Sequence, residues 1–236
     1  MTGANVWKHA DSLEAVGRKV TRYFLTSPGG RARGLADVGA LVTGGGAPTA
    51  PDYWTHDPLD VAHEDPALGL VSPASALDLR GRGVVYETSP LPKATEISGI
   101  PSLTLWLTID VPDADLAAEI HEITPDGKSI LLNDTRLRAR YRTSRSRPEL
   151  LSPGQPTRVV LDRFRFMSRL VAAGSRIRLV VRTPATSHLE VNYHSGGAVA
   201  FETARDARTA RIALHHEPGM ESALTLPMTA VSGRAP

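Results

Sequence analysis

The chain has 236 residues, of which 41% are hydrophobic and 22% are charged, as is usual for a globular protein. Its formal net charge of +2 and aromatic content of 5% argue against a nucleic-acid interface, and the lack of cysteine excludes disulfides and thiolate metal sites. No apolar run approaches the roughly 20 residues of a membrane span, and the N-terminus lacks the apolar core of a signal peptide, so we expect a cytoplasmic protein that does not contact membrane.

The first 80 residues are predicted to form a loop-rich extension. A β-prone segment at 21–26 ends at a Ser-Pro-Gly-Gly sequence, and the Gly-rich residues that follow allow at most one short strand near 39–43. Residues 51–80 look irregular. A metal site is conceivable there, but Pro58 interrupts any helix that would align its ligands, which favours a solvated or partner-facing loop. The ligands considered are His56, Asp57, Asp60, His63 and Glu64.

A sheet begins near residue 81. Leucine and isoleucine alternate with Thr and Trp over 103–109, as expected for a strand with one buried face. The Pro- and Asp-containing segment 111–115 ends this run, and a second run covers 117–123. A turn at Thr124–Gly127, with Gly where a positive φ is required, leads to a third run at 129–132. This pattern predicts an antiparallel sheet with one face buried.

Four arginines then occupy alternate positions, so they would share one face of an extended strand. They are Arg136, Arg138, Arg140 and Arg142. Planar guanidinium groups favour carboxylates and phosphates. We therefore predict an interaction face, used either for ion pairs with the chain's own acids or for docking on an acidic partner surface.

The rest of the chain predicts more short strands separated by turns. Alternation returns at 157–166 and 176–182, a brief helical turn is expected at 168–174, and a long polar loop covers 183–197. The last strands are predicted at 198–201, 210–215 and 223–226. Many short strands at this spacing are typical of a jelly roll or a related sandwich.

Several of these segments resemble a known family. The matching segments are Val85–Leu91, Ile97–Gly99, the Asp113–Asp115 turn, Leu137–Arg142 and Leu170–Leu179, with Gly3–Trp7 and Tyr23–Leu25 upstream. In this order they resemble the C-terminal jelly-roll domain shared by X-Pro dipeptidyl peptidases, cocaine esterase and α-amino-acid ester hydrolases. One departure is Ser175, which stands where the family usually has a histidine.

The resemblance implies an all-β fold: a galactose-binding-like jelly-roll sandwich over 81–236, on which the loop-rich extension 1–80 packs. It also implies that the family's catalytic Ser, Asp and His belong to a preceding hydrolase domain. In agreement, the sequence contains no Gly-x-Ser-x-Gly nucleophile motif. We therefore expect no family triad in this chain.

Other candidate groups come from the residues themselves. His194 precedes Ser195 in a polar loop, but neighbouring residues of an extended segment point apart, so the imidazole is poorly placed to serve that hydroxyl. His194, Asn192 and His56 remain candidate acid/base groups. Asp113 and Asp115 offer oxygen ligands of the kind that Ca²⁺ prefers, with a plain turn as the alternative. His121 is expected to be structural, and only one histidine of the pair at 215–216 can face inward.

Three functional hypotheses follow. The first is a non-catalytic accessory domain that acts by protein contacts or completes a partner's substrate pocket, the partner being a hydrolase domain or a second copy of the chain. The second is a stand-alone enzyme with a site recruited in the sandwich or its loops. The third is a small-molecule or carbohydrate-binding module, although Trp7, Trp54 and Trp106 are too scattered to predict an aromatic row. No cofactor is predicted.

Overall fold

The computed structural model describes residues 1–16, 19–30, 32–34, 36–45, 49–60, 79, 81–184 and 190–230. Within them the chain forms β-strands and short 3-10 helices, and no α-helix. The strands are β1 (Thr21–Thr26), β2 (Gly39–Val42), β3 (Asp52–His56), β4 (Gly83–Glu87), β5 (Thr95–Gly99), β6 (Ser102–Ile109), β7 (Asp115–Ile123), β8 (Ser129–Arg138), β9 (Pro156–Leu161), β10 (Met167–Val171), β11 (Arg176–Arg182), β12 (Ala210–Leu214), β13 (Ala223–Leu226) and β14 (Met228–Ala230). The 3-10 helices are η1 (Leu13–Ala15), η3 (Ala139–Tyr141), η4 (Val199–Phe201) and η5 (Ala204–Asp206).

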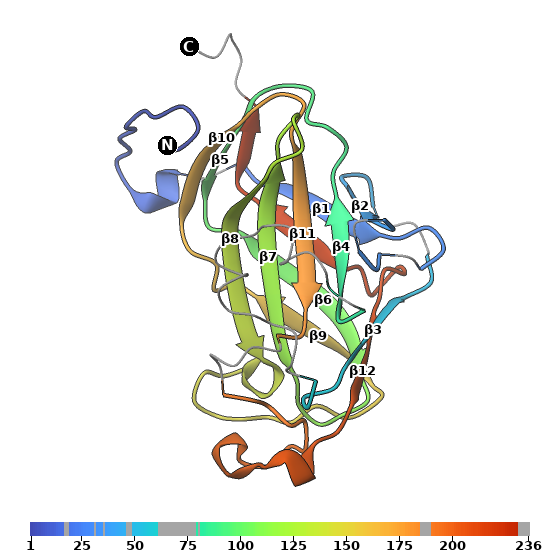
Figure 1. Cartoon of the computed structure of the whole chain (residues 1–236). Coiled ribbons are helices and arrows are strands. Elements are labelled where there is room, and N and C mark those ends of the chain that lie inside the picture. Colours follow the sequence, from blue (N-terminus) through green and yellow to red (C-terminus); the bar gives the residue numbers. More distant parts are fainter. Residues whose placement is uncertain are drawn as a thin grey trace.

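The strands form a sandwich of two layers. The larger sheet has the order β3-β12-β6-β13-β1-β2-β4-β11-β7-β8, with β9 also paired to β6, and a small sheet has the order β10-β5-β14. The larger sheet turns back on itself, so that β4, β11, β7 and β8 lie in front of β6 and β9 (Figure 1). This arrangement confirms the predicted all-β sandwich.

Burial of one face explains strands such as β2, β3 and β6. In β6, Leu103, Leu105 and Leu107 are fully buried, and the Thr and Trp side chains between them are half-buried on the outer face. The predicted alternation is confirmed there. The central strand β11 is buried on both faces, because Val180 packs with Val85 in a second, smaller apolar cluster outside the main core.

The N-terminal part joins the larger sheet. β1 pairs with β13 and β2, and β3 pairs with β12. The prediction of an irregular segment is wrong at β3, whose alternate residues Asp52, Trp54 and His56 are buried. His63 and Glu64 lie outside the described residues, and the domain boundary proposed at residue 80 stays a prediction.

Two further local predictions are wrong. The segment expected to form a helical turn at 168–174 contains β10, which pairs along its whole length with β5. The strand expected at 198–201 is the 3-10 helix η4, closed by the bond from the Phe201 N–H to the Ala198 carbonyl. Pairing with β5 makes the first segment a strand, whereas a hydrogen bond within the second segment closes it into a helical turn. None of the helices in the described residues is long and apolar enough to cross a membrane.

Candidate functional site

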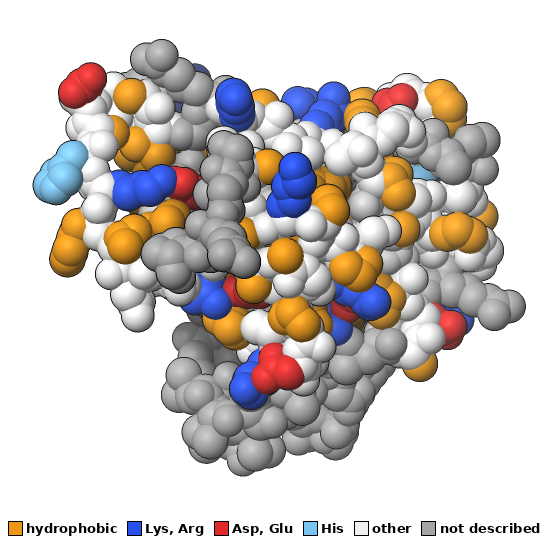
Figure 2. Space-filling view, turned by 90° about the horizontal axis from the view of Figure 1, so that it is seen from above, with side chains coloured by type: hydrophobic (Ala, Val, Ile, Leu, Met, Phe, Trp, Pro, Cys, Tyr) orange, Lys and Arg blue, Asp and Glu red, His pale blue; other side chains and the backbone are white. Residues whose placement is uncertain are grey.

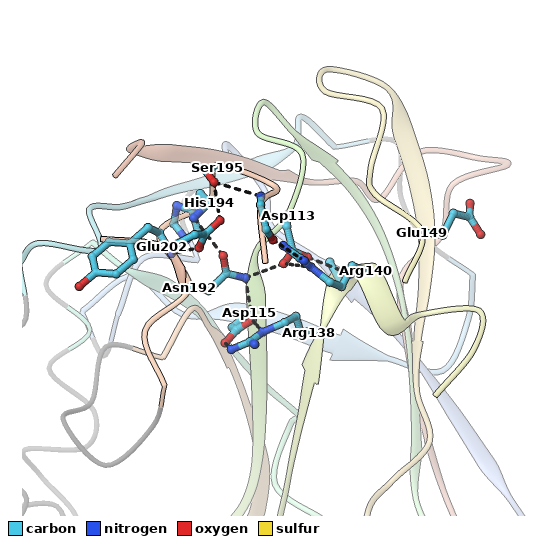
Figure 3. Close-up of polar contacts among 12 residues, drawn as sticks. Asp113, Asp115, Arg138, Arg140, Glu149, Asn192, His194, Ser195 and Glu202 are labelled. Carbon is cyan, nitrogen blue, oxygen red and sulfur yellow. Dashed lines mark hydrogen bonds and ion pairs between the residues drawn. The ribbon is translucent and has the colours of Figure 1, made fainter. Parts of the chain in front are cut away.

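Many of the polar residues singled out from the sequence meet at one end of the sandwich. The loop Asn192–Gly197 lies there against the turn that joins β6 to β7 (Figure 3). The Asn192 amide donates to the Asp113 carboxylate at 2.7 Å and to Asp115 at 3.0 Å. Its own carbonyl oxygen accepts from the His194 backbone N–H at 2.9 Å, so one buried amide connects the turn to the loop.

Two arginines complete the pairing of these carboxylates. Arg140 donates from its backbone N–H and from Nε to the two oxygens of Asp113, at 2.9 and 2.7 Å, and from Nη1 to the Gly197 carbonyl at 2.7 Å. Arg138 makes a bidentate contact with Asp115 at 2.8 and 3.0 Å. The Asp113–Arg140 pair is almost fully buried, with side-chain exposures of 0% and 8%. Guanidinium and amide groups therefore occupy the carboxylate oxygens that the sequence offers as metal ligands.

The arginine face does not have the predicted geometry. The expectation that all four arginines share one strand face is wrong, because β8 ends at Arg138 and the chain then turns into η3. Arg136 is exposed, whereas Arg140 is buried, and Arg142 donates to Glu149 at 2.6 Å. Ion pairing with the chain's own acids accounts for Arg138, Arg140 and Arg142, and a role in binding a partner stays a prediction.

His194 and His56 form a buried pair of imidazoles. The His56 Nδ1 and His194 Nε2 atoms are 3.3 Å apart, and His194 Nδ1 lies 2.8 Å from the Arg208 carbonyl. A carbonyl can only accept, so Nδ1 of His194 carries the proton, and its Nε2 accepts from Nδ1–H of His56. His56 Nε2 is then a buried acceptor without a hydrogen-bond partner.

The environment of this pair disfavours a positive charge. Burial and, after it, the charge of a protonated His194 lower the pKa of His56 to about 4. Burial also lowers the pKa of His194, although its bond to the Arg208 carbonyl opposes this effect. His194 has a φ of 66°, in the left-handed region that few non-glycine residues adopt, and the Asn192 side chain bonds its N–H there. The contacts of His194 with Asn192, Arg208 and His56 therefore hold the loop in this conformation.

Ser195 has a different partner from His194. Its hydroxyl donates to Glu202, which also accepts from the Tyr193 N–H at 3.1 Å. Both ring nitrogens of His194 are engaged elsewhere, so the adjacent His-Ser pair does not form a nucleophile and base. No group of three or more His, Asp or Glu in the described part of the chain could hold a metal ion.

A second polar cluster was not foreseen from the sequence. The fully buried Asp52 accepts from the Tyr86 hydroxyl at 2.6 Å and from His216 Nε2 at 2.8 Å. Burial raises the pKa of Asp52, but the bonds from His216 and Tyr86 outweigh it and hold the pKa below its ordinary value. His216 is the inward member of the histidine pair, as expected, and His215 lies on the outer face. No sequence signal joins residues so far apart in the chain.

Two hydroxyl–imidazole–carboxylate triads also occur outside these clusters. Thr108 Oγ1 lies 2.7 Å from His215 Nε2, and His215 Nδ1 lies 3.0 Å from Glu217. On another part of the sheet, Ser129 lies 3.2 Å from His121 Nδ1, and His121 Nε2 lies 3.2 Å from Glu119. The sequence does not indicate either triad, because each joins residues that only the pairing of strands brings together.

Fold and site together define a jelly-roll β-sandwich domain whose loops at one end are connected by buried polar contacts. The chain belongs to the family described as the X-Pro dipeptidyl-peptidase C-terminal non-catalytic domain, whose model matches residues 1–225. This match confirms the resemblance inferred from the sequence motifs.

Known relatives agree with this assignment. The chain is 26% identical over 236 residues to cocaine esterase of Rhodococcus sp. (strain MB1 Bresler), with 96% of this chain and 40% of the esterase covered. Its fold is similar to that of an aminopeptidase from the marine sediment archaeon Thaumarchaeota archaeon (TM-score 0.77, 18% identity, 97% of this chain and 39% of that one). It is also similar to an α-amino acid ester hydrolase (TM-score 0.75, 18% identity, 89% and 36%). The chain therefore spans less than half the length of each of these relatives.

Proposed function

We propose that the chain is the accessory domain of a serine ester or peptide hydrolase, and that it docks on the hydrolase domain and helps to complete its substrate pocket. The family membership supports the accessory role, because the matched family is described as non-catalytic. The similar proteins described above are named as esterases and a peptidase, which suggests the class of partner.

The observation that carries the docking proposal is the exposure of hydrophobic side chains in the N-terminal segment. Trp7 is 93% exposed, and Val6, Leu13 and Val20 are also exposed. Seen from the end of the molecule where the N-terminus lies in Figure 1, hydrophobic side chains are exposed at several places between basic and acidic ones (Figure 2). A tryptophan is among the residues that contribute most when they are buried in a protein interface.

This segment is also held in place. Thr2 donates its N–H to the Ser168 carbonyl and accepts from the Leu170 N–H, both at 2.9 Å, so the chain start lies along β10. Lys8, next to Trp7, forms an ion pair with Glu96 on β5. A surface that is already ordered loses less conformational entropy on binding than a free tail would. The segment is therefore suited to contact a partner surface.

Binding between this chain and the part of cocaine esterase that it does not cover would test the proposal. We expect saturable binding by calorimetry, and at least about tenfold weaker binding for Trp7→Ala, which corresponds to roughly 1.4 kcal/mol. Phe166→Ala is the matched control, because Phe166 is a half-exposed aromatic residue on the segment between β9 and β10. Equal loss in both variants, or no binding, would count against docking through the N-terminal segment. Sedimentation of the chain alone measures the other possible partner, a second copy.

A further inference from the structure

The Thr108–His215–Glu217 triad has the order of groups that nucleophilic catalysis requires: a hydroxyl, an imidazole and a carboxylate. The hydroxyl faces Nε2 of the imidazole at 2.7 Å, and the carboxylate faces Nδ1 at 3.0 Å. The same polarity is found in the Ser-His-Asp triad, where Nε2 takes the proton of the nucleophile and the acid orients the ring. Thr108 is half-buried, and the side chains of His215 and Glu217 are 12% and 33% exposed, so solvent reaches the group.

The hydrogen bonds determine which atoms carry protons. One Glu217 oxygen accepts from the His216 backbone N–H at 3.1 Å and the other faces the His215 ring. Burial raises the pKa of Glu217, but backbone N–H donors and His215 outweigh this effect and lower it, so the carboxylate is ionised at neutral pH. The ionised carboxylate requires a proton on His215 Nδ1, which leaves the Nε2 lone pair to accept the Thr108 O–H.

The neighbours of Thr108 follow from the strand register. Its cross-strand partners are the small residues Pro156 on β9 and Ala213 on β12. Paired residues share a face of the sheet, so the exposed Arg158 lies beside Trp106, one row from Thr108. Tyr53, on β3, is paired with Ala213 and is 41% exposed. The hydroxyl thus has small partners on both sides, with aromatic side chains and a guanidinium group on the same face.

We propose that Thr108, His215 and Glu217 form an acyl-transfer site for small activated aryl esters, an activity separate from the accessory role. Thr108 Oγ1 attacks the ester carbonyl carbon while its proton passes to His215 Nε2. The bond to the phenolic oxygen then breaks, and the phenol leaves with that proton. Water, deprotonated by His215, cleaves the Thr108 ester and releases the carboxylic acid, which restores the hydroxyl. Arg158, one row from Thr108 on the same face, is the cation that we assign to the developing oxyanion.

The other hydroxyl–imidazole–carboxylate triad, formed by Ser129, His121 and Glu119, provides a matched control. In it the ring is reversed, with Nδ1 toward Ser129, and both contacts are longer, at 3.2 Å. Its Glu119 is also paired with Arg182 at 3.0 Å. We expect this second triad to be structural, so that Ser129→Ala leaves any esterase activity unchanged.

The experiment measures p-nitrophenyl acetate hydrolysis by the purified chain and locates the acetyl group by peptide mass spectrometry. The expected result is a burst of p-nitrophenol, an acetyl group on Thr108, and a rate reduced about 100-fold or more in Thr108→Val or His215→Gln. Unfolding midpoints of the variants confirm that each remains folded. A wild-type rate in Thr108→Val, or an acetyl group found only on other residues of the wild-type chain, would overturn the proposal whatever the fold of the variants.

Glu217 acts through His215 and is a positioning residue. Glu217→Gln removes the ionised acceptor that fixes the ring tautomer, so we expect a lower maximal rate and a shifted midpoint in the dependence of the rate on pH. Glu217→Asp should restore part of the rate. A purely structural role would change the unfolding midpoint without moving the pH profile, and this outcome would contradict the assignment of Glu217.

Discussion

Removing the Asp113 carboxylate should destabilise the protein more than any surface substitution. Asp113 is fully buried and accepts three hydrogen bonds, two from Arg140 and one from Asn192. In Asp113→Ala the Arg140 guanidinium stays inside with no carboxylate beside it, and its Nη2 atom already lacks a partner. The variant therefore leaves a buried positive charge uncompensated.

The magnitude follows from this burial. Removing one partner of a buried ion pair costs about 3–5 kcal/mol, whereas a whole domain is stable by only about 5–15 kcal/mol. With a urea slope of about 2–3 kcal/mol/M, the unfolding midpoint should fall by about 1–2.5 M. The fluorescence of the buried Trp54 provides the signal for this titration.

Two variants make the test specific. Asp126→Ala removes an exposed partner of Lys128 and should leave the midpoint unchanged within error. Asp113→Ala combined with Arg140→Met removes both charges and should recover most of the lost stability. An Asp113→Ala variant within about 1 kcal/mol of the wild type would refute the reasoning, as would a double variant no more stable than the single one.

Two other predictions concern different parts of the structure. The folded-state pKa of His56, about 4, is below its unfolded value near 6.5, so its contribution of about 3 kcal/mol is present above pH 6.5 and is lost as the pH falls toward 4. Urea titrations at several pH values should show this slope in the wild type and in the control His9→Asn, but a reduced one in His56→Asn. Gly39→Ala would place a Cβ atom 2.4 Å from the Tyr86 ring and should cost about 1–3 kcal/mol by thermal unfolding, whereas Gly44→Ala, with no atom within 4 Å, should change little. A flat pH dependence in the wild type, or equal effects of the two glycine substitutions, would contradict these two expectations.

The strands that the sequence predicts well are those with one buried face. In β6 the burial of alternate side chains is a local property, visible as a period of two. The turn at Gly127, with a φ of 83°, was also predictable, because glycine adopts that conformation without strain. Local physics is sufficient for these elements.

β3 could not be predicted in the same way. Its sequence Asp-Tyr-Trp-Thr-His places two ionisable side chains at inward positions, which is unfavourable without partners. The partners exist but are distant in the chain: His216 binds Asp52, and His194 contacts His56. An inward position for either residue makes sense only after the fold has brought these groups together.

The candidate site shows the same division. The sequence indicates His56, Asn192 and His194 as candidate acid/base groups and Asp113 as a candidate metal ligand. The fold brings these four residues into one connected set of contacts. The residue types were informative, because each is costly to bury alone. Their roles were not predictable, since these depend on Arg140, which was expected on an exposed strand face and is buried instead.

Buried charge in this cluster specifies position more than it adds stability. An apolar pair of similar volume is often as stable as a buried ion pair, so hydrophobic burial alone could replace Asp113 and Arg140. Such a pair has no directional contacts, however, and could not hold the Gly197 carbonyl or orient the Asn192 amide as Arg140 and Asp113 do. These bonds keep the loop after Asn192 in one conformation, with the 86%-exposed Phe201 beyond it in η4. Loops that are already held in one conformation lose less conformational entropy if a partner binds them.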